Sequence, residues 1–168
     1  MDIFGHFYLE EEKVWILQFT CLASRAISLE PLYSISAEHI ILALRSFIAR
    51  CGTPTLILSD LGSQFQPAIE TLKENIAPEI EWNTIPGKSP WFGAAYERLI
   101  GITKNSFERT FHNMNISRYA FRTILFKLEN VINDWPITYV ENEKGLQPLT
   151  PNCFILLKRE YRKSLPII

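Results

Sequence analysis

The chain has 168 residues, of which 47% are hydrophobic and 21% charged, and it carries a formal net charge of −1. This length and composition favour a single globular domain and exclude disorder, collagen and coiled coil as descriptions of the whole chain. The charge is unevenly divided, because residues 1–81 carry a net charge of −6 and residues 82–168 a net charge of +5. Such a division of charge suits a site that holds metal ions beside a surface that binds phosphate. Charged residues on solvent-exposed faces can produce a similar imbalance by chance.

The cysteines and the apolar runs narrow the class of protein further. Cys21, Cys51 and Cys153 are odd in number and widely spaced, and the sequence contains no C-x-x-C pair, so we expect neither a disulfide framework nor a structural zinc site. No apolar stretch approaches the roughly 20 residues needed to span a bilayer, and the N-terminus does not resemble a signal peptide. These features predict an intracellular protein, nuclear or cytoplasmic, with no membrane partner.

The first third of the sequence predicts a β-meander. Residues 13–21 (KVWILQFTC) are rich in β-branched and aromatic side chains, which is typical of a buried strand. We expect residues 3–9 to form the strand before it, with residues 10–12 (EEE) as the turn of a hairpin. Residues 25–32 alternate in polarity and predict a third, antiparallel strand.

The pattern then becomes helical and alternates with short strands. Ser36 can cap a helix whose apolar residues repeat at helical spacing, and Gly52 and Pro54 would end it. Later strands are predicted at residues 55–59 and 80–85, and later helices at residues 66–74, 94–111 and 117–135, with a Pro- and Gly-containing loop at residues 86–93. This order predicts an α/β fold with a mixed sheet and helices on both faces.

Three carboxylates occupy positions from which they could converge. Asp60 follows the predicted parallel strand, Asp2 lies in the first strand and Glu97 lies in the first turn of the helix that follows the loop. Carboxylates from separate elements can hold Mg²⁺ and leave positions open for phosphate and water. The pattern alone is equally compatible with an Asp60 that caps a turn, a Glu97 that interacts with the helix dipole and a disordered Asp2.

Five ordered motifs resemble the catalytic core of retroviral-type integrases. Residues 59–65 (SDLGSQF) are similar to the S/T-D-N-G-x-x-F motif of that family, and residues 85–98 (IPGKSPWFGAAYER) are similar to its I-P-x-x-S-P-x-x-G-G-x-x-E-R block. The start at residues 2–7 (DIFGHF), the run at 13–30 and the close at 149–154 (LTPNCF) also resemble the family. Among its branches, the W-F-G before the glutamate and residues 132–139 (INDWPITY) resemble Pao/BEL-type LTR retrotransposons most.

The resemblance implies a fold and a metal site. The family has an RNase H-like fold, which implies a mixed five-stranded sheet flanked by helices on both faces. It also implies that Asp2, Asp60 and Glu97 are the catalytic metal ligands for two Mg²⁺ or Mn²⁺ ions, with 36 residues between the last two. The implied activity is phosphoryl transfer on DNA, namely hydrolysis near a 3′ end followed by strand transfer to target DNA.

The same resemblance indicates residues that contact DNA. Lys104 lies seven residues after Glu97, so helical geometry puts both on nearly one face. We expect Lys104, Arg98, Lys88 and Gln64 to contact nucleic acid, with Lys104 as a solvated surface lysine being the alternative. The expected partners are retroelement ends, target DNA and a second copy of the chain in a homodimer or higher oligomer. We expect the catalytic core at residues 1–139 and an extension with a short basic tail at residues 140–168.

Two departures from the family pattern motivate a second hypothesis. Leu61 replaces the usual Asn after the aspartate, and a branched aliphatic residue in a left-handed conformation costs about 1–2 kcal/mol. The sequence also begins one residue before Asp2, from which we expect a truncated first strand and a fragment of a longer protein. The alternative is therefore a catalytically inactive integrase relic that binds nucleic acid or protein. An RNase H-type nuclease is a more distant possibility on the same fold.

Overall fold

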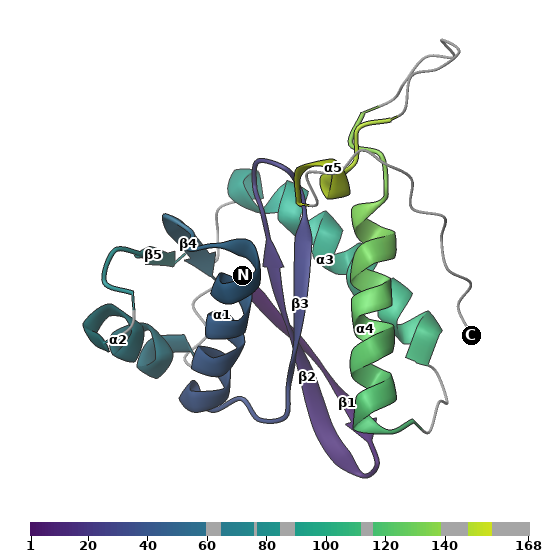
Figure 1. Ribbon diagram of the computed structural model, residues 1–168, viewed down its shortest axis with the longest axis horizontal. Helices are drawn as coiled ribbons and strands as arrows, with labels where there is room; N and C mark the ends of the chain where they lie inside the picture. The colour runs from purple at the N-terminus through teal and green to yellow at the C-terminus, as the bar shows by residue number, and fades with distance from the viewer. Residues whose placement is uncertain (60–64, 76, 85–89, 112–115, 139–147, 156–168) are drawn as a thin grey trace.

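The computed structural model describes residues 1–59, 65–75, 77–84, 90–111, 116–138 and 148–155, and it has a mixed α/β architecture (Figure 1). The elements follow one another as β1 (Asp2–Leu9), β2 (Glu12–Thr20), β3 (Ile27–Leu32), α1 (Ala37–Cys51), β4 (Leu56–Ser59), α2 (Gln66–Asn75), β5 (Glu81–Thr84), α3 (Pro90–Phe111), α4 (Arg118–Asn133) and α5 (Pro151–Ile155). The predicted order of strands and helices is confirmed, with the short α5 added.

Strands β1, β2 and β3 form an antiparallel sheet in that spatial order. The β1–β2 turn has positive φ at both Glu10 and Glu11, which suits the twist of a tight hairpin. The register shifts between Gly5 and Phe7, where β1 contains one extra residue. Gly5 has a φ of +104°, and a Cβ atom there would lie 2.8 Å from the Phe7 ring, so this bulge requires glycine.

Strands β4 and β5 pair in parallel as a separate two-stranded sheet. The single five-stranded sheet that the sequence predicts is therefore not confirmed, because the described strands are divided three and two. A hydrogen bond crosses the division from the Met1 amino group to the Leu58 carbonyl, at 2.6 Å. β4 has only four residues, so it offers β1 little length for a continuous ladder.

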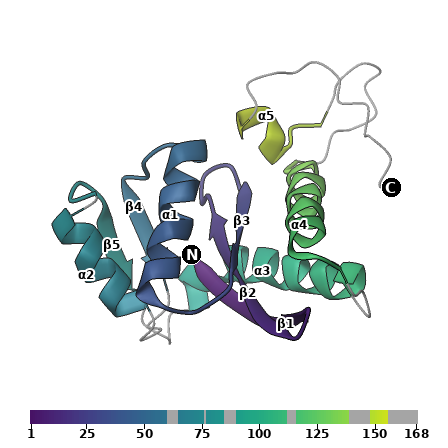
Figure 2. The same ribbon diagram turned by 60° about the horizontal axis from the view of Figure 1, so that its bottom comes forward.

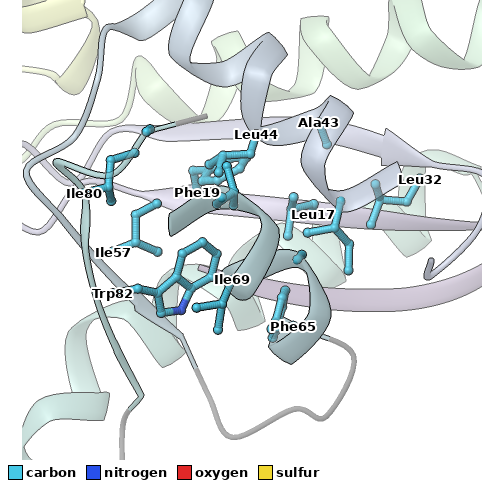
Figure 3. Close-up of a cluster of buried hydrophobic side chains, with 14 residues drawn as sticks. Leu17, Phe19, Leu32, Ala43, Leu44, Ile57, Phe65, Ile69, Ile80 and Trp82 are labelled. Atoms are coloured by element: carbon cyan, nitrogen blue, oxygen red, sulfur yellow. The ribbon is translucent and has the colours of Figure 1, made fainter. Parts of the chain in front are cut away.

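Strand β2 is buried on both faces and separates two hydrophobic cores. Leu17 and Phe19 point into a core shared with α1, α2, β4 and β5, where Leu44 and Trp82 are also buried (Figure 3). Val14 and Ile16 point the other way, into a core shared with α3 and α4. Helix α1 therefore covers one face of the three-stranded sheet, with α2 packed beside α1, and α3 and α4 cover the other face (Figure 2). This confirms the prediction of helices on both faces.

The free edge of β3 is covered by side chains of α4. The Asn133 amide accepts from the Ile27 N–H and donates to the Ile27 carbonyl, both at 2.8 Å. One turn earlier, Glu129 accepts from the Leu29 N–H at 2.7 Å. We call these four residues the β3 edge contact. An uncovered edge strand would present unpaired backbone groups, so α4 completes the sheet with side chains in place of a further strand.

The helix ends follow the predicted signals with one exception. Ser36 caps α1 and accepts from the His39 N–H, while Gly52 ends that helix with a φ of +89°. Helix α3 begins at Pro90, so the prediction of a loop through residue 93 is wrong for residues 90–93, and the rest of that loop lies outside the described residues. Proline suits the first position of a helix because its missing N–H would have no partner there.

The last described segment, residues 148–155, packs on the end of α4 and the residues that follow it. Asn152 of α5 donates to the Asn130 carbonyl at 3.3 Å, and the Ile137 N–H donates to the Leu149 carbonyl at 2.8 Å. The division at residue 139 stays a prediction. Within the described part of the chain, no helix is both long and apolar enough to cross a bilayer.

Candidate metal and nucleic-acid site

A large cavity lies between β1, β4 and the middle of α3. It has a volume of about 930 Å³, and it also reaches the end of β2, the end of α1 and α5. Asp2, Glu97 and Lys104 are among its lining residues, and we call the surface that these three contribute the carboxylate end. A cavity of this size is within the range of ligand and substrate sites in proteins.

Asp2 reaches the cavity from the first position of β1. Its cross-strand partner is Gln18, and its side chain is half-buried. Phe4, two residues further on, is buried in the core beneath α3, whereas Ile3 contacts the opposite core. Because alternate residues of a strand point to one face, Asp2 lies on the α3 side of the sheet. The bond from the Met1 amino group to the Leu58 carbonyl holds this strand end beside β4.

Glu97 and Lys104 reach the cavity from α3. Glu97 is the eighth residue of that helix, so its predicted position in the first turn is wrong, because the helix begins at Pro90. Glu97 is exposed, and Lys104 is half-buried with its Nζ 5.7 Å from the centre of the Phe4 ring. Seven residues of helix bring both side chains to the same cavity, as the spacing predicts.

The other predicted site residues are less fully placed. Asp60, Gln64 and Lys88 lie outside the described residues, although Asp60 directly follows Ser59, the last residue of β4. Arg98 is exposed on α3. The described residues contain no group of three His, Cys, Asp or Glu side chains that could hold a metal ion. The structure therefore brings together two of the three predicted ligands, Asp2 and Glu97, with Lys104.

These donors fit a divalent cation such as Mg²⁺. Asp2 and Glu97 offer hard carboxylate oxygens from two elements to one cavity, and Mg²⁺ prefers such ligands while retaining several waters. Lys104 at the same cavity suits the phosphate of a polynucleotide better than it suits a small cation. The carboxylate end thus offers side chains of the types that suit metal and phosphate.

Two thiols, Cys21 and Cys51, also line the cavity. Both are free and exposed. Partial burial acts to raise the pKa of the Cys21 thiol, but hydrogen bonds from Ser24 and Ala23 outweigh it and leave that pKa below its ordinary value. The Ser24 N–H donates to the Cys21 Sγ at 3.4 Å. Burial raises the pKa of Cys51. Cys21 is therefore the more readily ionised of the two.

Reasoning from the sequence missed Gln18, a polar residue beside the site. Its side chain is fully buried in β2, directly across from Asp2, and its Nε2 lies 3.2 Å from the Oγ1 of Thr20, which lines the cavity. The signal that could have found it is the presence of one amide within the apolar run of residues 14–19.

Comparison with known proteins identifies the fold. No protein-family model and no curated protein sequence matches the chain. Among solved structures, it is similar to the HTLV-2 integrase catalytic core domain in complex with magnesium (trimeric form), with a TM-score of 0.59 and 21% identity over 89% of each chain. It is also similar to the catalytic core domain of BIV integrase, with a TM-score of 0.60 and 15% identity over 91% of each chain.

A third similar structure is longer than this chain. It is a chain in the simian T-cell lymphotropic virus intasome in complex with PP2A regulatory subunit B56 gamma, with a TM-score of 0.65 and 18% identity. The match covers 99% of the present chain but only 55% of that one, so the present chain spans about half of its length. At these identities the likeness shows the fold, which is that of retroviral integrase catalytic cores.

Proposed function

We propose that this chain is the catalytic core of a retroelement integrase and performs metal-dependent phosphoryl transfer on DNA. The observation that carries the proposal is the meeting of Asp2 and Glu97, distant in the sequence, at one cavity with Lys104. The likeness of the fold to integrase catalytic cores supports the same conclusion.

In this proposal Asp2, Asp60 and Glu97 hold two Mg²⁺ or Mn²⁺ ions. Bound metal would supply charge neutralisation at the reacting phosphate. The chain's own residues bind and orient the DNA: Lys104, Arg98, Lys88 and Gln64 contact its backbone. The reaction is hydrolysis near a DNA 3′ end, followed by attack of the new 3′ hydroxyl on a target phosphodiester. Each step exchanges one phosphorus–oxygen bond for another and needs no protein nucleophile.

We further propose the lineage and the assembly. The motifs at residues 85–98 and 132–139 favour a Pao/BEL-like LTR retrotransposon. The HTLV-2 core is known in trimeric and dimeric forms, which supports a homodimer or higher oligomer as the working state of this chain. DNA in the nucleus or cytoplasm is the expected partner.

Calorimetric titration with Mn²⁺ tests the metal site. We expect saturable binding to the wild-type chain, weakened by about tenfold or more in Glu97→Gln because a negatively charged ligand is lost. Glu108→Gln is the matched control, since Glu108 is another exposed glutamate of α3 and does not line the cavity. Equal Mn²⁺ affinity in wild type and Glu97→Gln would contradict the proposal.

DNA-binding and DNA-cleavage assays distinguish the inactive relic from an enzyme. Four arginines on α3 and α4 are exposed and could bind DNA without metal, namely Arg98, Arg109, Arg118 and Arg122. A relic would bind DNA with an affinity that is indifferent to Mg²⁺ and falls steeply with salt concentration. An enzyme would additionally cleave or join a labelled DNA end only with Mg²⁺ or Mn²⁺, and would lose this activity in Glu97→Gln.

A further inference from the structure

Among the described residues, Gln18 has a buried side-chain oxygen whose hydrogen bonding the fold does not complete. It is fully buried, and its sequence neighbours Leu17 and Phe19 are apolar residues that point to the opposite face of the sheet. Its Nε2 lies 3.2 Å from the Thr20 Oγ1, but its Oε1 has no hydrogen-bond partner among the described residues. A buried amide oxygen without a partner is costly, and an apolar side chain would fill the same space without that cost.

The strand register places this amide next to Asp2. Asp2 and Gln18 are directly paired across β1 and β2, and the side chains of such a pair lie on one face with Cβ atoms roughly 5 Å apart. That face is the α3 side of the sheet, because Ile16 and Phe4 of the neighbouring pair are buried against Phe107 of α3. Asp2 and Thr20 both line the cavity, so the Gln18 amide lies directly beneath the carboxylate end.

The orientation of the Gln18 amide determines whether its oxygen or its N–H groups face Asp2. A half-turn about the last side-chain bond exchanges the oxygen and the nitrogen of a glutamine amide. In the exchanged orientation the Thr20 hydroxyl donates to the amide oxygen, which gives that oxygen a partner. The N–H groups then take the place of the orphaned oxygen, on the side of the sheet where the Asp2 carboxylate lies.

We propose that Gln18 is a positioning residue for Asp2, and that its amide N–H donates to one oxygen of the Asp2 carboxylate. The other oxygen is thereby directed into the cavity, toward the metal site of the proposed function. Outer-shell hydrogen bonds of this kind orient metal ligands and commonly change metal affinity by about 10- to 100-fold. The inference rests on the proposed function for its purpose, but the Gln18–Asp2 contact itself needs no metal.

Hydrogen exchange of the Gln18 side-chain amide tests the contact without metal. We expect exchange by NMR to be about tenfold faster in Asp2→Ala than in wild type, as for the loss of one hydrogen bond to a charged group. Glu97→Gln should leave this rate unchanged. The Asn133 amide is the internal control, because its partners are the backbone groups of Ile27. An unchanged Gln18 rate in Asp2→Ala would overturn the proposal.

A Gln18→Met variant tests the consequence for the metal site. Methionine keeps the length of the side chain and removes the amide, so we expect a thermal midpoint equal to or above that of wild type together with about tenfold weaker Mn²⁺ binding. A lower midpoint with unchanged Mn²⁺ affinity would indicate a merely structural role and would overturn the proposal. If the wild-type chain binds no Mn²⁺, the proposed function fails, while the exchange experiment still decides whether Gln18 positions Asp2.

Discussion

Two regions on the same side of the sheet use buried polar groups in opposite ways. At the β3 edge contact, Asn133 is 2% exposed and both ends of its amide are hydrogen-bonded to Ile27. At the carboxylate end, Gln18 is equally buried, yet its oxygen has no partner within the described part of the chain. A buried amide whose hydrogen bonds are complete stabilises the fold, whereas one with an unpaired oxygen needs an explanation. The comparison therefore separates a region with complete hydrogen bonding from the region where we propose that Gln18 positions Asp2.

The largest expected effect is at the β3 edge contact. Asn133→Ala removes both bonds and leaves the buried Ile27 N–H and carbonyl without partners, so the free energy of unfolding should fall by about 2–5 kcal/mol. Urea unfolding measures this change. The exposed Asn83→Ala in β5 is the control and should change stability by less than about 0.5 kcal/mol. A loss in Asn133→Ala as small as that of the control would remove the distinction between the two regions.

A smaller effect is expected where α1 joins β3. Arg50 pairs with Glu30, which is 5% exposed, and donates to the Ser28 hydroxyl at 3.1 Å. Because the Arg50 side chain is 38% exposed, we discount the cost of a fully buried pair and expect Arg50→Met to lose about 2 kcal/mol. Arg118→Met breaks the exposed pair with Glu12 and should lose less than about 1 kcal/mol. Equal losses in urea unfolding would show that burial of the glutamate does not matter.

The smallest effect is a pH dependence at Glu129. Burial raises the pKa of this carboxyl, although the Leu29 N–H and Arg50 act to lower it. A raised pKa in the folded state means that the protonated form favours folding. The stability contributed by this proton is full below the unfolded pKa, near 4.5, and is lost as pH rises through the folded pKa.

Glu129→Gln keeps an oxygen for the Leu29 N–H and cannot titrate, so it isolates this contribution. Relative to the variant, the wild-type chain should gain stability as pH falls from about 7 toward 4.5. Urea unfolding of both proteins across that pH range measures the difference in their free energies of unfolding. The expected result would show that the β3 edge contact, although its hydrogen bonds are complete, contains a carboxyl group that resists ionisation. A difference that does not change with pH would contradict the cause assigned to the pKa shift.

The elements of the fold were predictable because their signals are local. The apolar run of β2, the Ser36 cap of α1 and Gly52 at the end of α1 each act over a few residues, and the structure places them as predicted. The start of α3 was not predictable from the Pro and Gly content of residues 86–93, because a proline can either break a helix or begin one. The structure shows that Pro90 begins α3 and does not interrupt a helix.

The sequence by itself determined the alternating α/β order, the two-faced burial of β2 and the candidate carboxylates, because residue type and spacing carry that information. Only the tertiary structure decided that Asp2 and Glu97 share one cavity, that α4 completes the edge of β3, and that Gln18 lies across from Asp2 on the neighbouring strand. Each of these depends on strand register and on the packing of helices against a sheet. A shift of one residue in the β1–β2 register would move Asp2 to the opposite face, and the residue types alone do not fix that register.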